Sequence, residues 1–139
     1  MKTILTLQGD KDTGKSQTIG ILLENVRISG YTIIQDKKRK GSHDFFVILE
    51  KKHKKIGLCT YGDVKSLILA KVEIFIKIQC EVIVCACHKK GATVRALESV
   101  TGYSVEYLAK TVAAKSTDRS DCNKRDAERL LARIESLLL

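Results

Sequence analysis

The residues with the clearest chemical meaning lie near the start of the chain, where two glycines frame a lysine and a hydroxyl. Residues 9–16 read Gly-Asp-Lys-Asp-Thr-Gly-Lys-Ser and match the pattern G-x-x-x-x-G-K-[ST]. The glycines allow a tight turn, so that successive backbone N–H groups point inward and form a nest for an anion. Lys15 can reach β- and γ-phosphates, and the Ser16 hydroxyl can ligate Mg²⁺. The pattern therefore predicts a phosphate-binding loop.

The position of this loop supports the same interpretation. A β-prone run from Ile4 to Gln8 stops at Gly9, and a helical pattern follows from Lys15. The N-terminus of a helix adds partial positive charge where the loop ends. In this context residues 9–16 resemble the Walker A motif of the P-loop NTPase superfamily. The resemblance is detailed over the motif and loose over the rest of the chain.

The resemblance implies a nucleoside triphosphate and Mg²⁺ as cofactors. Lys15 would act in catalysis through its contact with the β- and γ-phosphates, and Ser16 would hold the metal. ATP is favoured over GTP, because the base-reading pattern N-K-x-D occurs at 123–126 after a polar stretch instead of a strand. Asp10 and Asp12 should point to solvent, away from a polyanion. The cofactor-binding residues would be Gly9, Asp10, Lys11, Asp12, Thr13, Gly14, Lys15, Ser16 and Gln17.

Many P-loop enzymes place a second acid at the end of a strand, where it holds the Mg²⁺ shell or positions water. Asp63 is the first candidate for this catalytic and metal-binding role, although it equally suits the N-cap of a helix starting at Val64. Asp36, at the predicted tip of the second strand, is the second catalytic candidate, with a solvated loop acid as the alternative. Glu50 is the third, and its place in a hairpin connection favours a plain surface charge.

Two further groups of residues have weaker chemical meaning. Cys85, Cys87 and His88 invite a zinc site, but closed zinc sites need four ligands, so buried strand thiols are the simpler interpretation. The segment from His88 to Thr93 resembles a strand-to-helix loop able to contact phosphate or base, with Lys89, Lys90 and Arg95 as candidate cations. The alternative is a solvated basic loop.

The formal net charge is +9, and much of it lies in two clusters at 37–40 and 51–55. Such a charge favours anionic partners, which include an anionic second substrate or nucleic acid. The chain has three Phe, four Tyr and no Trp, which argues mildly against stacking of single-stranded bases. The cluster at 51–55 is also what a hairpin uses against edge-to-edge aggregation.

The hydrophobic pattern alternates between strands and helices. Expected strands are 4–8, 31–35, 45–49, 56–60, 81–87 and an edge strand at 103–111; expected helices are 15–29, 64–78, 93–100 and 118–139. The connection 50–55 is too short for a parallel crossover and predicts an antiparallel hairpin. These elements predict an α/β protein: a three-layer α/β/α sandwich, P-loop NTPase-like, with a mostly parallel sheet and one antiparallel hairpin.

The chain has 139 residues without proline or a low-complexity linker, which predicts a single domain over 1–139. No apolar run reaches the length of a membrane span, so we expect no membrane partner. The odd number of five cysteines and the short apolar N-terminus indicate a cytoplasmic protein. An oligomer contact near Leu137–Leu139 is a secondary possibility.

Three functions fit these features. The first is a protein that binds Mg-ATP through the loop and acts as a small ATPase or phosphotransferase. The second is a nucleotide-dependent switch or binding module with little turnover, favoured by the absence of the usual apolar strand ending in an acid. The third is a basic nucleic-acid-binding domain, in which the glycine loop is incidental.

Overall fold

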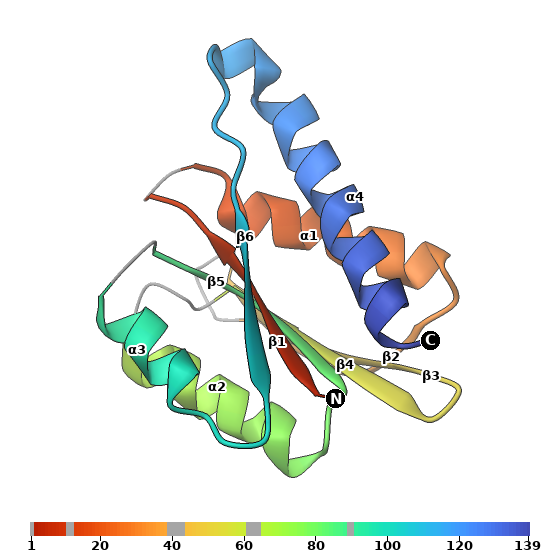
Figure 1. The fold of residues 1–139 in the computed structure, drawn as a ribbon. Helices are drawn as coiled ribbons and strands as arrows, with labels where there is room; N and C mark the ends of the chain where they lie inside the picture. The colour runs from red at the N-terminus through yellow and green to blue at the C-terminus, as the bar shows by residue number, and fades with distance from the viewer. Residues whose placement is uncertain (1, 11–12, 39–43, 61–64, 89–90) are drawn as a thin grey trace.

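The computed structural model describes residues 2–10, 13–38, 44–60, 65–88 and 91–139, and within them six strands form one sheet (Figure 1). The strands are β1 (Thr3–Gln8), β2 (Thr32–Lys38), β3 (Phe45–Lys51), β4 (Lys54–Cys59), β5 (Val82–Cys87) and β6 (Ser104–Ala109). Their order across the sheet is β2-β3-β4-β5-β1-β6. The strand that leads into the candidate loop therefore lies inside the sheet, and β6 is an edge strand as predicted.

The predicted mostly parallel sheet with one hairpin, in a P-loop NTPase-like sandwich, is wrong. Parallel pairing holds for β4 with β5, β5 with β1 and β1 with β6, whereas β2, β3 and β4 are joined by two antiparallel pairings. The sheet is mixed, with its antiparallel part at the β2 end. The physical reason is that β2 continues to Lys38, so the connection 39–44 to β3 is too short for a parallel crossover.

Helices cover both faces of this sheet (Figure 1). α1 (Lys15–Ile28) and α4 (Arg119–Leu137), the latter preceded by a 3₁₀ turn at Ser116–Asp118, pack together on one face. α2 (Lys65–Lys77) and α3 (Ala92–Glu98) lie on the other. Across the part of the chain that the structure describes, no helix combines the length and apolar character needed to cross a bilayer.

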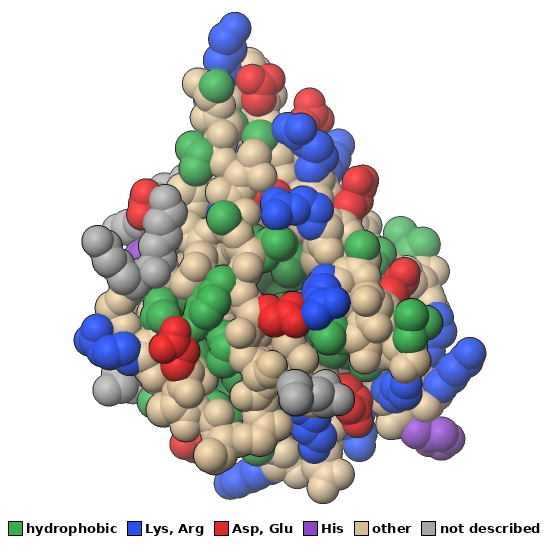
Figure 2. All heavy atoms as spheres, viewed as in Figure 1, with side chains coloured by type: hydrophobic (Ala, Val, Ile, Leu, Met, Phe, Trp, Pro, Cys, Tyr) green, Lys and Arg blue, Asp and Glu red, His purple; other side chains and the backbone are tan. Residues whose placement is uncertain are grey.

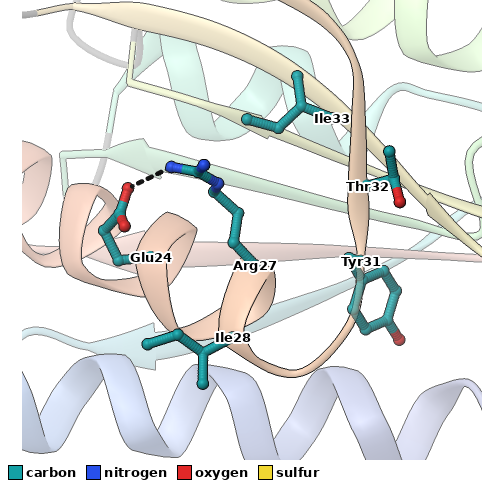
Figure 3. Close-up of a pocket in the computed structure, with 6 residues that line it drawn as sticks. All are labelled: Glu24, Arg27, Ile28, Tyr31, Thr32 and Ile33. Carbon is teal, nitrogen blue, oxygen red and sulfur yellow. Dashed lines mark hydrogen bonds and ion pairs between the residues drawn. The ribbon is translucent and has the colours of Figure 1, made fainter.

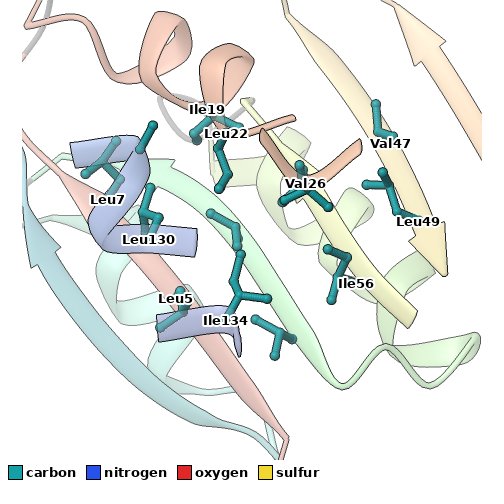
Figure 4. Close-up of a cluster of buried hydrophobic side chains, with 14 of the residues drawn as sticks. Leu5, Leu7, Ile19, Leu22, Val26, Val47, Leu49, Ile56, Leu130 and Ile134 are labelled. Carbon is teal, nitrogen blue, oxygen red and sulfur yellow. The ribbon is translucent and has the colours of Figure 1, made fainter. Parts of the chain in front are cut away.

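Alternation along the strands divides the core between the two faces. Val47 and Leu49 of β3 face α1 and α4, whereas Phe46 and Ile48 face α2. Figure 4 shows the first cluster, in which strand residues meet side chains from both helices: Leu5, Leu7, Val47, Leu49 and Ile56 against Ile19, Leu22, Val26, Leu130 and Ile134. The buried side chains of α1 and α4 recur at helical spacing, so each helix packs on the sheet through one apolar stripe.

On the opposite face, Gly57 of β4 makes room for an aromatic ring. A Cβ atom at Gly57 would lie 2.4 Å from the ring of Phe75, so only glycine allows this approach. The Phe75 ring stacks on Phe46, with ring centroids 4.6 Å apart. α2 is thereby held flat against the antiparallel end of the sheet.

Candidate phosphate-binding site

The candidate loop begins where three neighbouring strands end together. Gln8 of β1 lies level with Cys87 of β5 and Ala109 of β6. The Gly9 N–H donates to the Cys87 carbonyl over 3.2 Å, and the Lys110 N–H donates to the Gln8 carbonyl over 2.7 Å. The entrance of the loop is therefore fixed to the sheet on both sides.

The exit of the loop is the N-terminus of α1. Gly14 has a left-handed backbone, with φ 93° and ψ 20°, which glycine adopts with little strain. Its carbonyl accepts hydrogen bonds from both the N–H and the hydroxyl of Thr18, at 2.9 and 2.8 Å. Among the described residues no side chain caps this helix end, and the first turn holds no acid. The positive end of the α1 dipole therefore faces the loop.

Lys15 folds back across the loop. Its side chain is 6% exposed, and its Nζ donates a 2.7 Å hydrogen bond to the Gly9 carbonyl. The Thr13 hydroxyl donates to the Asp10 carbonyl over 2.8 Å. The ammonium group is thus held between the two ends of the loop, where it can exchange a carbonyl for a phosphate oxygen.

The remaining predicted cofactor-binding residues differ in exposure. Ser16 is half-buried and Gln17 is exposed in the first turn of α1. Asp10 is exposed. Lys11 and Asp12 lie outside the described residues.

A buried ion pair that the sequence analysis missed lies behind the loop entrance. Lys110 Nζ is 2.9 Å from Asp126 Oδ2, and both side chains are fully buried. Asp126 also accepts hydrogen bonds from the N–H and hydroxyl of Thr111, at 2.8 and 2.7 Å, and from Arg129 at 3.0 Å. A Cβ atom added to Gly9 would lie 3.0 Å from the Lys110 Cβ. The pair therefore forms the wall against which the loop begins.

Asp126 stays ionised because its partners outweigh its burial. Burial alone raises the pKa of this carboxyl, but hydrogen bonds from Thr111 and Lys110 lower it further than burial raises it. The net result is a pKa below the ordinary value for aspartate. Asp126 is the last residue of the N-K-x-D pattern, and in this structure its carboxylate is fully engaged by the protein.

Asn123, one turn earlier on α4, lies against the loop exit. A Cβ atom added to Gly14 would lie 2.6 Å from Asn123 Oδ1. The Asn123 Nδ2 group donates to Gln17 Oε1 over 3.5 Å. Asn123 and Asp126 therefore bracket the loop from one face of α4, the first at its exit and the second at its entrance.

The candidate acids are not gathered at this site. Asp63 lies outside the described residues, and its role stays a prediction. Asp36 lies within β2, not beyond its tip, and is exposed on the far edge strand. Four strand spacings separate β2 from β1, which is about 19 Å. The structure therefore does not bring Asp36 to the Mg²⁺ position beside Ser16. Glu50 pairs with Lys55 in the β3–β4 register, remote from the loop exit.

The cysteines form a buried set. All five, each within the described residues, are buried thiols outside any disulfide. Burial, with Cys59 and Cys87 nearby, raises the pKa of the Cys85 thiol well above its ordinary value. Within the described ranges, no group of three or more His, Cys, Asp or Glu could hold a metal ion. The zinc interpretation of Cys85, Cys87 and His88 therefore has no support from the described residues.

Two lysines of the basic cluster at 51–55 donate hydrogen bonds to backbone carbonyls at the C-terminal ends of helices. Lys51 Nζ donates to the Ser29 carbonyl after α1 over 2.8 Å and lies 5.3 Å from the Tyr31 ring centroid. Lys54 Nζ donates to the Leu138 carbonyl after α4. Positive charge is favourable at helix C-termini, so these side chains have a structural use. In the other cluster, Lys37 is exposed on β2, and Arg39 and Lys40 lie outside the described residues.

The two clefts found on the described part of the surface lie away from the candidate loop. On the face seen in Figure 2, Lys and Arg side chains are interspersed with Asp and Glu. A cleft of about 480 Å³ lies at the C-terminal end of α1, where Arg27 pairs with Glu24 on the rim (Figure 3). Its lining residues are Glu24, Arg27, Ile28, Tyr31, Thr32 and Ile33, none of which belongs to the candidate loop.

Comparisons with known proteins give little similarity. No family model matches the chain, and no curated protein does. Among solved structures, the chain is similar to EndoMS in its apo form, with 18% sequence identity and a TM-score of 0.42. The match covers 73% of this chain and 49% of that chain, so it spans about half of the EndoMS chain. Such a low similarity supports no conclusion about fold or function, and none of these comparisons indicates a P-loop NTPase.

Proposed function

We propose that residues 9–16 bind the phosphates of a nucleoside triphosphate, with Mg-ATP as the favoured ligand. The observation that carries the proposal is the arrangement of Lys15. Its buried ammonium group lies across a loop whose last glycine is left-handed and opens directly onto an uncapped helix N-terminus. A buried cation and a helix dipole directed at one point are the features that bind a polyphosphate.

In this proposal the ligand replaces contacts that the loop now makes with itself. Lys15 Nζ leaves the Gly9 carbonyl for β- and γ-phosphate oxygens, while backbone N–H groups of the loop surround the phosphates. The Ser16 hydroxyl, half-buried in the first turn of α1, ligates Mg²⁺. This use of the motif resembles the P-loop NTPase superfamily over the strand–loop–helix unit.

ATP remains the favoured nucleotide over GTP. Recognition of guanine by N-K-x-D would need a carboxylate that is open to the base, whereas the Asp126 carboxylate is bound by Lys110, Thr111 and Arg129.

We also infer a cytoplasmic location, because all five cysteines are buried thiols of the kind that persist in a reducing compartment. An anionic second substrate or nucleic acid stays a prediction from the net charge.

We infer turnover as a small ATPase or phosphotransferase, with a slow nucleotide-dependent switch as the alternative. Release of inorganic phosphate from Mg-ATP separates the two. If the protein is an enzyme, the wild type should release inorganic phosphate above background and Lys15→Ala should not. Asp63→Asn then tests the second acid: an enzyme that uses Asp63 loses release while retaining nucleotide binding. Binding without release in the wild type would favour the switch.

A thermal-unfolding series tests binding itself without requiring turnover. A ligand that binds only the folded state adds about 2.7 kcal/mol of stability at one hundred times its Kd. We therefore expect the Tm of the wild type to rise with Mg-ATP concentration and that of Lys15→Ala to stay constant. An equal rise in both proteins would contradict binding at the loop.

A further inference from the structure

Beside the loop, one buried polar atom has no hydrogen-bond partner among the described residues. Asn123 is 5% exposed, and its Oδ1 atom is buried without a hydrogen bond. Its Nδ2 group donates to Gln17 Oε1 over 3.5 Å, so the carboxamide nitrogen has a partner and the oxygen does not. Buried acceptors are almost always satisfied in folded proteins, so an unsatisfied one needs an explanation.

This atom lies at the uncapped start of α1. Oδ1 would be 2.6 Å from a Cβ atom at Gly14, so the carboxamide lies directly over the loop exit. Gln17, which accepts the hydrogen bond from Asn123 Nδ2, is an exposed residue of the first turn of α1. A helix N-terminus without a side-chain cap and an acceptor without a donor therefore meet at one place.

The chemistry of the atom decides which part of a nucleotide it suits. A carboxamide oxygen only accepts hydrogen bonds, and the phosphates of Mg-ATP are themselves acceptors. The nucleoside is different, since the adenine amino group and the ribose hydroxyls are donors. Asp126 offers no competing acceptor, because its oxygens are bound by Lys110, Thr111 and Arg129.

We propose that Asn123 is a nucleoside-recognition residue, whose Oδ1 accepts a hydrogen bond from an amino or hydroxyl donor of the nucleotide bound at residues 9–16. This inference rests on the proposed function. It assigns to α4 a direct part in choosing the ligand, while residues 9–16 supply the phosphate contacts common to all nucleotides.

The test compares Asn123→Ala and Asn123→Leu with the wild type by calorimetric titration of Mg-ATP and of Mg-bound inorganic triphosphate. Asn123→Leu keeps the number and branching of the side-chain heavy atoms but replaces the polar atoms with methyl groups. We expect both variants to bind Mg-ATP about tenfold more weakly, as for one lost hydrogen bond, and to bind triphosphate as the wild type does. The control is Asn25→Ala in the last turn of α1, at the end of the helix away from the loop, which should change neither titration.

Thermal unfolding without nucleotide separates recognition from a structural role. Removing a buried unsatisfied acceptor relieves a cost in the free protein, and leucine and alanine are better helix formers than asparagine. We therefore expect at least one of the two variants to have a Tm equal to or above that of the wild type. A lower Tm for both variants would show a structural role and overturn the proposal.

Analogues identify the donor. In the wild type, loss of affinity for 2′-deoxy-ATP points to the ribose, and loss for inosine triphosphate points to the adenine amino group. In Asn123→Ala the same analogue should bind as ATP does. Equal ATP affinity in wild type and variants, or a parallel loss of triphosphate binding, would contradict the proposal. A wild type that binds neither ATP nor triphosphate would refute the proposed function and with it this inference.

Discussion

Two glycines of the loop and helix should respond oppositely to alanine. Gly14 has φ +93° and faces Asn123, whereas Gly20 lies inside α1 with open space around its Cβ position. Gly14→Ala should destabilise the protein by about 1–3 kcal/mol through backbone strain. Gly20→Ala should stabilise it by about 0.5–1 kcal/mol through helix propensity. Urea unfolding measures both, and a Gly14→Ala protein as stable as the wild type would contradict the left-handed geometry.

Removing one partner of the buried ion pair behind the loop should lower the free energy of unfolding more than removing both partners together. Asp126→Leu alone leaves the buried Lys110 ammonium group without its carboxylate and should cost about 3–5 kcal/mol, whereas Lys110→Met should cost less, because Arg129 still pairs with Asp126. The double variant should recover a large part of that loss, because no buried charge remains. A double-mutant cycle by chemical unfolding measures this coupling. Additive losses would mean that the two side chains do not interact.

The pH dependence of stability should report Asp126. Its pKa is lower in the folded protein than in the unfolded chain, so the unfolded state binds the proton first. The contribution is fully present above the ordinary aspartate pKa of 3.8 and is lost as pH falls through the lower folded value. Asp126→Asn should therefore show a shallower loss of stability below about pH 4 than the wild type. Identical acid-unfolding profiles would contradict this assignment.

Helices and strands with a strong hydrophobic period were predictable from the sequence, but the direction of strand pairing at the β2 end of the sheet was not. The run 4–8, the helix from Lys15 and the apolar strand ending at Cys87 all occur close to their predicted positions. The end of β2 was misjudged, because Asp36, Lys37 and Lys38 have low strand propensity. They nevertheless pair with β3 across a register shift between Ile33 and Gln35. Tertiary pairing overrode propensity here, and the sheet direction changed with it.

The position of the loop between a strand and a helix was predictable, because its pattern lies in consecutive residues. The residues that bracket it were not, since Lys110 and Asp126 meet only through the packing of α4 beside β6. One signal was present: Cys122, Asp126, Leu130 and Ile134 recur every four residues, and all are buried. A carboxylate within such a buried stripe indicates a buried partner of opposite charge.

At the scale of the hairpin, its lysines should differ in their effect on stability. Lys51 bonds the Ser29 carbonyl and lies over the Tyr31 ring, whereas Lys52 is exposed at the turn. Lys51→Met should lower the free energy of unfolding by about 1 kcal/mol, and Lys52→Met should leave it nearly unchanged. Equal effects, measured by urea unfolding, would argue that the cluster acts through its net charge and not through helix ends.

Over the whole molecule, the positive charge is unevenly distributed. Residues 96–139 carry seven basic and seven acidic side chains, so the net charge of +9 belongs to residues 1–95. That part contains the candidate loop and both lysine clusters. A field of this sign raises the local concentration of any polyanion, whichever site binds it. Binding of Mg-ATP must therefore be assigned to the loop by a variant and not by charge alone.

Calorimetric titration of Mg-ATP into wild type, Lys15→Ala and Lys77→Ala tests the central claim most directly. Lys77 is an exposed lysine at the end of α2, so its replacement removes the same charge without touching the loop. The account predicts saturable binding in the wild type and Lys77→Ala, and none in Lys15→Ala. Absence of binding by the wild type at millimolar Mg-ATP, or equal binding by Lys15→Ala, would contradict a phosphate site at residues 9–16.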